Sequence, residues 1–325
     1  MDFQDTPKIE LHLHLEGAMP PVFARRLADE KNISLEGVFD ENGGYAYRDF
    51  WHFLEVYEAA TQVLTGPEEF GRLTKAVLVQ SAEHGVVYTE AFISPDFCGG
   101  RDLGAWKEYL AAMQQAAGEA ELEHGIKLRG IVTPIRHFGA EKAKETAICA
   151  VETAGDFITG FGIGGDEKAG ALADFAWSFD CAREAGLRLT AHAGEWGGPE
   201  SVRDALTLNV ERIGHGVRAI EDAELVKELV DRQVTLEVCP GSNVFLGVYP
   251  TLTDHPLAHL MEAGVNCTVS TDDPPFFHTT MTQEYQNLAS VFGFDAGVFS
   301  ELNRAAAKAA FCDEDTRAGL LKQFT

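Results

Sequence analysis

The sequence predicts an α/β protein folded as a single (β/α)8 TIM barrel. Short apolar runs alternate with longer amphipathic stretches along the chain, a pattern typical of parallel βαβ units. Eight such units in 325 residues match the size of a TIM barrel, although a doubly wound open sheet would give a similar alternation. Polar residues gather at the C-terminal ends of nearly all the apolar runs. This placement favours the barrel, because that fold builds its active sites there.

The eight apolar runs are the candidate strands, and helical patterns separate them. They comprise residues 9–15, 86–93, 127–132, 157–163, 188–192, 212–217, 235–239 and 267–271. No low-complexity segment, Ser/Pro linker or block of like charge divides the chain, so we expect one domain over residues 1–325.

The segment between the first two candidate strands is unusually long and is expected to form a helical insertion at about residues 18–80. The insertion is rich in large apolar side chains, which suit a lid over the barrel mouth or an ordinary core, with about half expected in the core. These side chains are Tyr47, Phe50, Trp51, Phe53, Leu54, Val56 and Tyr57.

Composition excludes some classes of partner. The chain has 51 acidic and 26 basic residues, a formal net charge of −25, which argues against neutralising the phosphates of a nucleic acid. The N-terminus lacks the basic and apolar regions of a signal peptide, and no run of about 18 apolar residues suggests a membrane span. We therefore expect a cytoplasmic enzyme whose partner is a small molecule. The sequence is silent on its oligomeric state.

Six cysteines are scattered without a CxxC pair, so neither a disulfide framework nor a cysteine zinc site has support. We expect these cysteines to be buried thiols. They are Cys98, Cys149, Cys181, Cys239, Cys267 and Cys312.

The first strand carries two histidines with the spacing of metal ligands. Strand periodicity places Glu10, His12, His14 and Glu16 on one face and the intervening leucines on the other. In a barrel the leucines would face the helices and the histidines the axis. Two imidazoles at i and i+2 on an inward face can ligate one metal ion.

Three later strands end in residues that can join this pair. His192 has inward parity on the fifth strand, and Glu195 follows it in a glycine-rich turn. His215 ends the sixth strand between two glycines that allow close approach of a ligand. On the eighth strand Asp272 points inward, with Asp273 next to it. Taken alone, each histidine could be structural and the Asp272-Asp273 pair could form a turn or a helix cap. Four strand ends that each carry an inward-facing ligand residue together predict a metal centre.

Three histidines and a carboxylate form a nitrogen and oxygen site suited to zinc, with room for water. Zinc lowers the pKa of such a water and makes it a nucleophile. Glu195 could then pass protons to a substrate, while His215 could hold the hydroxide in line for attack. We expect one zinc ion per chain. Two-metal relatives of such sites bridge their ions with a modified lysine or a glutamate at the fourth strand, but here that strand ends in Gly162-Ile163-Gly164-Gly165-Asp166-Glu167, without a lysine. Glu167 is the residue that could support a second ion.

The motifs LHLHLEG, GGDE, HAGEWGGPESV, RIGHGV, CPGSN and STDDP together resemble the adenosine deaminase family of metal-dependent amidohydrolases. The match covers residues from about 8 to 277. The resemblance implies that His12, His14, His192 and Asp272 hold zinc, that Glu195 protonates ring N1, and that His215 orients the hydroxide that attacks C6. It also implies that Asp273 contacts N7 and that the backbone amide of Gly165 contacts N3.

Two features point to different substrates within this family. Glu16 stands where adenosine deaminases typically have an aspartate that contacts the ribose, and the adenine deaminase subgroup resembles this chain there. The segment Gly164–Glu167 is instead similar to the nucleoside enzymes. We give that segment slightly more weight, which makes adenosine, and with it deoxyadenosine, the first expected substrate. Adenine is the alternative, followed by other 6-aminopurine nucleosides.

Other functions have less support. A non-catalytic barrel would require a missing ligand or acid, and none is missing. Another amidohydrolase reaction could use the same metal, but Glu195 and Asp273 point to an aromatic ring with nitrogens. Polynucleotide deaminases use HxE with PCxxC, whereas Cys239-Pro240 has the reverse order here. The roles of His255, His259 and His278 stay open, with solvent-facing or helix-capping positions expected.

Overall fold

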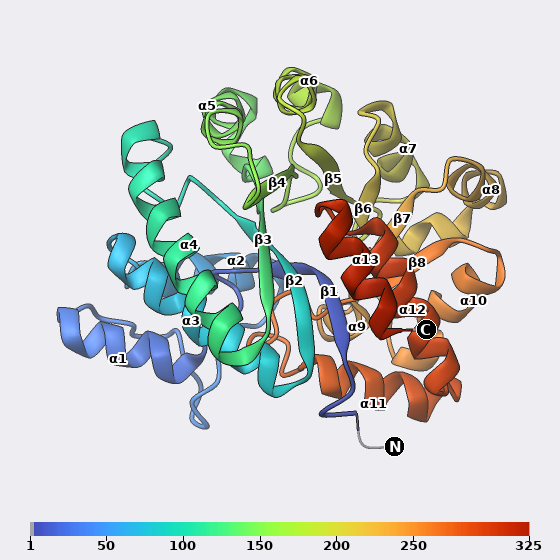
Figure 1. Cartoon of the computed structure of the whole chain (residues 1–325), viewed down its shortest axis with the longest axis horizontal. Helices are drawn as coiled ribbons and strands as arrows, with labels where there is room; N and C mark the ends of the chain where they lie inside the picture. Colours follow the sequence, from blue (N-terminus) through green and yellow to red (C-terminus); the bar gives the residue numbers. More distant parts are fainter. Residues whose placement is uncertain (1–2, 325) are drawn as a thin grey trace.

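The computed structural model describes residues 3–324 and contains an eight-stranded parallel sheet in the order β1 to β8 (Figure 1). The strands form a nearly closed barrel with helices between them, so the predicted (β/α)8 architecture is confirmed. The strands are β1 (Lys8–His14), β2 (Val86–Ile93), β3 (Lys127–Val132), β4 (Ile158–Phe161), β5 (Arg188–Ala193), β6 (Arg212–His215), β7 (Thr235–Val238) and β8 (Asn266–Val269).

All eight predicted strands exist, but β4, β6 and β8 each end two residues before their apolar runs do. The run at residues 212–217 ends as a strand at His215, because His215 and Gly216 adopt φ values of 60° and 68°. Such left-handed residues cannot continue a strand. The run at residues 157–163 likewise ends at Phe161, and Gly162 to Gly165 turn toward the cavity described below.

The barrel closes between β1 and the segment that follows β8. His14 N donates to Asp272 O, and Asp272 N donates to His12 O, each at 3.1 Å. Leu13 and Asp272 form an isolated parallel bridge at this point. Closure thus occurs at the level of the predicted metal ligands.

The helices surround the sheet in Figure 1, and three of them, α1 to α3, lie between β1 and β2. Their bounds are α1 (Pro21–Lys31), α2 (Phe50–Thr61), α3 (Pro67–Glu83), α4 (Leu103–His124), α5 (Ala140–Val151), α6 (Ala176–Glu184), α7 (Pro199–Thr207), α8 (Ala223–Asp231), α9 (Pro240–Phe245), α10 (Leu257–Glu262), α11 (Met281–Phe292), α12 (Ala296–Ala309) and α13 (Glu314–Gln323). Short 3₁₀ helices span Arg136–Phe138, Leu172–Phe175, Val217–Glu221 and Leu252–Asp254.

Local sequence explains where several helices begin and end. Asp102 caps α4 by accepting a hydrogen bond from Ala105 N at 2.9 Å, and Gly125 ends it in the left-handed conformation. Asp222 caps α8 in the same way through Glu224 N and Leu225 N. These helices turn an apolar face to the strands, and the buried side chains of both merge into one large core.

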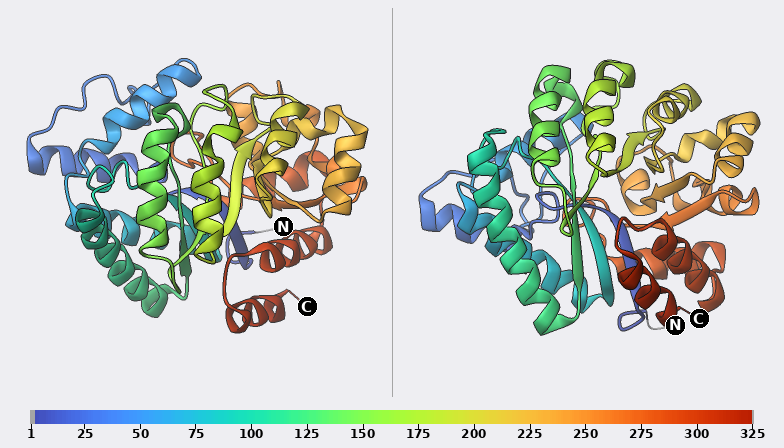
Figure 2. Two further views of the ribbon diagram at one scale, coloured as in Figure 1. Left: turned by 90° about the horizontal axis from the view of Figure 1, so that it is seen from above. Right: turned by 45° about the horizontal axis from the view of Figure 1, so that its top comes forward.

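The insertion and the C-terminal helices cover opposite ends of the barrel (Figure 2, left). Helix α2 lines the cavity at the C-terminal ends of the strands. At the other end, the segment after α12 places Phe311 against Phe92 and Ile131 inside the barrel. One end of the barrel therefore holds a cavity, and the other is closed by Phe311, which we call the Phe311 plug.

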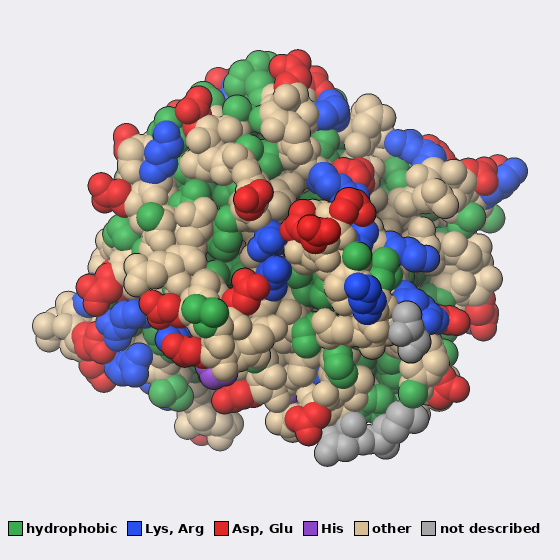
Figure 3. Space-filling model, in the orientation of Figure 1, with side chains coloured by type: hydrophobic (Ala, Val, Ile, Leu, Met, Phe, Trp, Pro, Cys, Tyr) green, Lys and Arg blue, Asp and Glu red, His purple; other side chains and the backbone are tan. Residues whose placement is uncertain are grey.

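The surface carries both signs of charge. On the face shown in Figure 3, Lys and Arg side chains lie scattered among Asp and Glu side chains. Within the described part of the chain, no helix is both long and apolar enough to cross a membrane. All six cysteines are free; four are buried as expected, whereas Cys181 and Cys312 are partly exposed.

Candidate metal centre and active site

Four predicted ligands come together at the C-terminal end of the barrel. His12, His14, His192 and Asp272 each offer one atom to a group in which all atoms lie within 4.8 Å of one another. His14 Nε2 is 3.2 Å from His192 Nε2, and Asp272 Oδ1 is 3.3 Å from His14 Nε2 and 3.5 Å from His12 Nε2. We call these four residues the ligand cluster.

The local structure explains this convergence. His12 and His14 project from the same face of β1, as strand periodicity requires, and β5 brings His192 to the same level. Gly214 of β6 leaves room for the imidazoles, because a Cβ there would lie 2.8 Å from His12 Cε1. Asp272 adopts a φ of 70°, which is strained for a residue other than glycine.

The electrostatics of the cluster favour a bound cation. Burial disfavours charge on His12, but Asp272 and Glu237 outweigh it and raise the His12 pKa to about 9. Burial likewise opposes ionisation of Asp272, yet the neighbouring His12 and His14 hold its pKa well below the usual range. Burial and the neighbouring histidines lower the pKa of His192 well below normal. The cluster thus stabilises one shared positive charge beside an ionised carboxylate.

An orphaned nitrogen tests whether these residues suit a metal. His12 Nδ1–H donates to Glu237 Oε2 at 2.8 Å, which leaves the Nε2 lone pair facing the cluster. That Nε2 is buried and has no hydrogen-bond partner. Three imidazoles and one carboxylate form a donor set that fits a borderline divalent cation such as zinc.

A cavity opens beside the cluster. Its walls combine polar residues from the strand ends with aromatic and aliphatic side chains from α2 and from the loops after β2, β3, β7 and β8. The apolar lining comprises Phe50, Phe53, Leu54, Tyr57, Phe97, Ile135, Leu246 and Phe277. Such a cavity suits a flat, largely apolar ligand held by a few polar groups.

Two buried carboxyl groups in this cavity lack partners. Glu195 Oε1 and Asp273 Oδ1 make no hydrogen bond, and both residues line the cavity. Burial and then the charge of Asp272 raise both pKa values well above the usual range. Protonated carboxyl groups donate hydrogen bonds, so both groups are suited to the nitrogen atoms of a bound ring.

His215 also lines the cavity, in a fixed tautomer. Asn243 Nδ2 donates to His215 Nδ1 at 3.1 Å, so the ring carries its proton on Nε2, 3.9 Å from Asp272 Oδ2. Burial lowers the His215 pKa to about 4, which keeps the ring neutral. Asn243 is itself oriented by His255, whose Nε2–H donates to Asn243 Oδ1 at 3.2 Å.

The remaining predicted site residues occupy different positions. Gly165 lines the cavity with a φ of 94°, and a Cβ there would lie 2.9 Å from His137 Nδ1. Glu16 is buried but is not among the lining residues; its carboxylate accepts from Ser94 N at 3.5 Å. Burial raises the Glu16 pKa to about 7.

Glu167 lies outside the ligand cluster and anchors the loop that carries Glu195. Its two oxygens accept hydrogen bonds from the backbone N–H groups of residues 194 to 197 and from Ser201 Oγ. Burial opposes its ionisation, but these hydrogen bonds lower its pKa below normal. Its lone pairs are therefore engaged with the loop and not with a second metal.

Sequence reasoning missed several supporting residues. Ser242 Oγ donates to Asp272 Oδ2 at 2.7 Å, and Asn243 orients His215 as described above. Both belong to the CPGSN motif, which was a usable signal. Glu237 contacts His12 from β7, and its inward position on that strand was the only sequence signal of this role. Of the three open histidines, His255 is buried and accepts from Leu257 N at the start of α10, His278 contacts the ring of Phe245, and His259 is exposed.

Comparisons with known proteins identify the family to which the chain is similar. The family model described as adenosine deaminase matches residues 7–325. An adenine deaminase from Rhizobium leguminosarum is 45% identical, over 97% of each chain. The crystal structure of an adenine deaminase from Arthrobacter aurescens superposes with a TM-score of 0.90 at 31% identity, covering 98% of each chain.

A third comparison concerns metal. An amidohydrolase from Burkholderia ambifaria, solved with bound zinc, is 25% identical with a TM-score of 0.87, covering 99% of this chain and 91% of that one. Similarity in sequence and fold therefore extends over essentially the whole molecule. On this evidence, the chain belongs to the adenosine deaminase family.

Proposed function

We propose that this chain catalyses the hydrolytic deamination of adenine to hypoxanthine and ammonia. The observation that carries the proposal is the meeting, in one aromatic-walled cavity, of a ligand cluster with two unpartnered carboxyl groups. Curated relatives named adenine deaminase, 45% identical over 97% of the chain, support this substrate. They favour the alternative that the sequence analysis placed second to adenosine.

We assign one zinc ion per chain to His12, His14, His192 and Asp272. When bound, the ion would supply a Lewis acid that makes water nucleophilic near neutral pH. His215 presents its Nε2–H on the Asp272 side of the cavity, where it can orient the attacking water. Asn243 keeps that proton on Nε2 by donating to Nδ1.

The two unpartnered carboxyl groups would hold the purine ring. The protonated Glu195 donates its proton to ring N1, which makes C6 a better electrophile. Asp273 hydrogen bonds on the N7 side, and the backbone N–H of Gly165 contacts N3. Water adds at C6 and ammonia leaves, so the ring keeps one oxygen in place of its amino group.

Two residues support the proposal of adenine rather than adenosine. Glu167 accepts hydrogen bonds from the loop that carries Glu195. A correctly placed Glu195 is needed for any purine substrate, with or without a ribose. The resemblance of Gly164–Glu167 to nucleoside enzymes therefore carries little information about a ribose. Glu16, the feature shared with the adenine subgroup, is the better guide.

We further propose that residues 1–325 form one deaminase domain, of which residues 1, 2 and 325 lie outside the described part. Helix α2 contributes Phe50, Phe53, Leu54 and Tyr57 to the cavity wall. This contribution supports a lid function for the insertion at about residues 18–80, because a substrate in the cavity would be covered by that helix.

Ultraviolet spectra recorded side by side with adenine, adenosine and deoxyadenosine test the proposal. We expect adenine to be consumed with the highest kcat/KM, and an ammonia assay to report one ammonia per purine. Turnover of adenosine with no reaction of adenine would refute the substrate assignment while leaving purine deamination intact.

A further inference from the structure

A layer of charged side chains fills the barrel below the ligand cluster, where TIM barrels usually hold branched apolar residues. Glu90 of β2, Arg212 of β6 and Glu237 of β7 are all at most 1% exposed. Arg212 Nη1 lies 2.7 Å from Glu90 Oε2, and Arg212 Nε donates to Glu237 Oε1 at 2.6 Å. Two carboxylates and one guanidinium leave the layer with a net negative charge beneath the cluster.

Glu237 joins this layer to the cluster. Its Oε1 accepts from Arg212 Nε and, at 2.9 Å, from Thr190 Oγ1, while its Oε2 accepts from His12 Nδ1 at 2.8 Å. Both oxygens are thus occupied, and the carboxylate has a single defined orientation. The contact determines which His12 nitrogen carries the proton, since a carboxylate can only accept.

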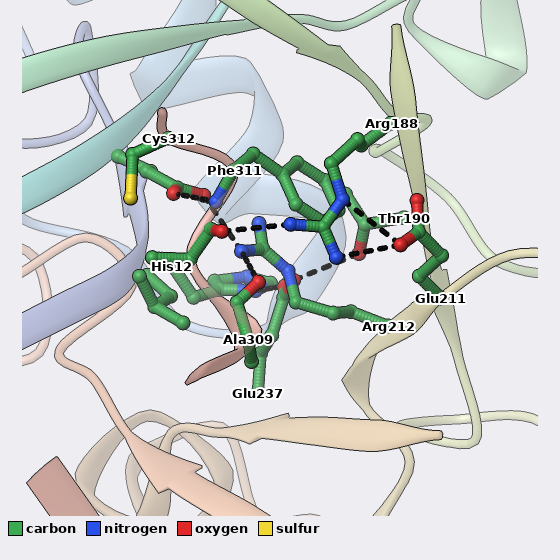
Figure 4. A network of polar contacts seen from close by, with 12 residues as sticks. His12, Arg188, Thr190, Glu211, Arg212, Glu237, Ala309, Phe311 and Cys312 are labelled. Carbon is green, nitrogen blue, oxygen red and sulfur yellow. Dashed lines mark hydrogen bonds and ion pairs between the residues drawn. The ribbon is translucent and has the colours of Figure 1, made fainter. Parts of the chain in front are cut away.

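Arg212 is held from the other side by the C-terminal segment. Its guanidinium carbon lies 3.5 Å from the centroid of the Phe311 ring, and Nη1 donates to Ala309 O at 3.1 Å (Figure 4). In Figure 4 the guanidinium of Arg212 lies among Phe311, Ala309, Glu237 and His12. The plug of the barrel therefore supports the carboxylate that contacts His12.

We propose that Glu237 is a positioning residue for metal binding, held in place by Arg212 and the Phe311 plug. It orients the His12 ring, keeps its proton on Nδ1 and adds negative charge behind a ligand of the cation. The inference rests on the metal site of the proposed function and deepens it. The competing explanation is purely structural: Glu237 serves only to neutralise Arg212.

The variant Glu237→Gln separates the two explanations. It keeps the size of the side chain but removes its charge and one accepting oxygen. We expect the variant to bind zinc about 10 to 100 times more weakly than the wild type, the range typical of such outer contacts, and therefore to lose it faster to a competing chelator. We also expect zinc to raise its melting temperature less, relative to the chelated protein, than it raises that of the wild type.

Glu69→Gln is the matched control. Glu69 is also buried, and it pairs with Lys31 at 2.7 Å, but it lies on α3 away from the cluster. We expect this variant to lower the melting temperature while keeping the wild-type rate of zinc loss. A purely structural Glu237 would behave in the same way, and that result would overturn the inference.

A second variant guards against misfolding, because Glu237→Gln leaves Arg212 buried without one partner. The triple variant Glu90→Gln, Arg212→Met, Glu237→Gln removes all three charges of the layer, including that of Glu90, which would otherwise lose its partner. We expect it to fold and still lose zinc faster than the wild type. Wild-type zinc retention in the triple variant would also overturn the inference. If the wild type itself binds no zinc, the metal site of the proposed function fails as well, so the two failures are distinguishable.

Discussion

At the scale of single residues, backbone strain coincides with the site. His215 and Asp272 are both left-handed residues other than glycine, with φ values of 60° and 70°. Such conformations persist only where surrounding contacts impose them. Here Asn243 holds the ring of His215 and Ser242 holds the carboxylate of Asp272. Both side chains reach the same point of the site, with His215 Nε2 3.9 Å from Asp272 Oδ2.

Glu195→Gln should abolish most of the activity without loss of zinc. The amide cannot supply the proton that the buried carboxyl offers, although it fills the same space. We expect a loss of about 10²-fold or more in kcat, in line with removal of a general acid, and unchanged zinc content by atomic absorption.

The control for this substitution is Glu58→Gln. Glu58 also lines the cavity, but it is half exposed and lies 3.6 Å from His137 Nε2. We expect it to change kcat much less. Wild-type activity in Glu195→Gln would refute the assignment of the acid.

At the scale of elements, the loop between β5 and α7 depends on one buried carboxylate. Consecutive N–H groups of residues 194 to 197 converge on Glu167, which follows β4. Converging N–H groups form an anion-binding nest, and here the anion is supplied by the chain itself. The position of Glu195 is thus set by a residue 28 positions earlier in the sequence.

Glu167→Gln should loosen this loop. A glutamine offers one accepting oxygen where the glutamate offers two, so some of the loop N–H groups would lose their partner. We expect a lower unfolding free energy by about 1–3 kcal/mol in urea denaturation, together with a lower kcat. Glu200→Gln, an exposed change at the start of α7, should alter neither. Equal effects of the two substitutions would contradict the anchoring role.

The elements also show what could be predicted from sequence. Apolar runs and strand parity suffice to locate the eight strands and to bring His12, His14, His192 and Asp272 together. Parity cannot reveal which side chains from different strands touch. The Glu237 contact with His12 joins residues 225 positions apart, and it depends on barrel closure and register that no local pattern encodes. Glu167 shows the same limit, since all but one of its partners are backbone groups, which nearly every residue type offers.

At the scale of the whole molecule, the cluster sits on the seam that closes the barrel. Within the described residues, β1 meets the segment after β8 through two backbone hydrogen bonds, between His12 or His14 and Asp272. The neighbouring pair β1 and β2 shares a longer ladder of paired residues. A cation shared by β1, β5 and Asp272 would therefore hold together the least paired junction of the sheet.

Removal of the metal should consequently loosen the seam more than the rest of the barrel. We expect chelation to lower the melting temperature and to increase amide hydrogen exchange in peptides covering residues 8–19 and 266–274, measured by mass spectrometry. Peptides from β2 and β3, residues 86–93 and 127–132, serve as the internal reference because their ladder spans six residue pairs. Readdition of zinc should restore protection. A uniform increase over all strands would mean that the metal stabilises the fold as a whole, and the seam would then have no special dependence on it.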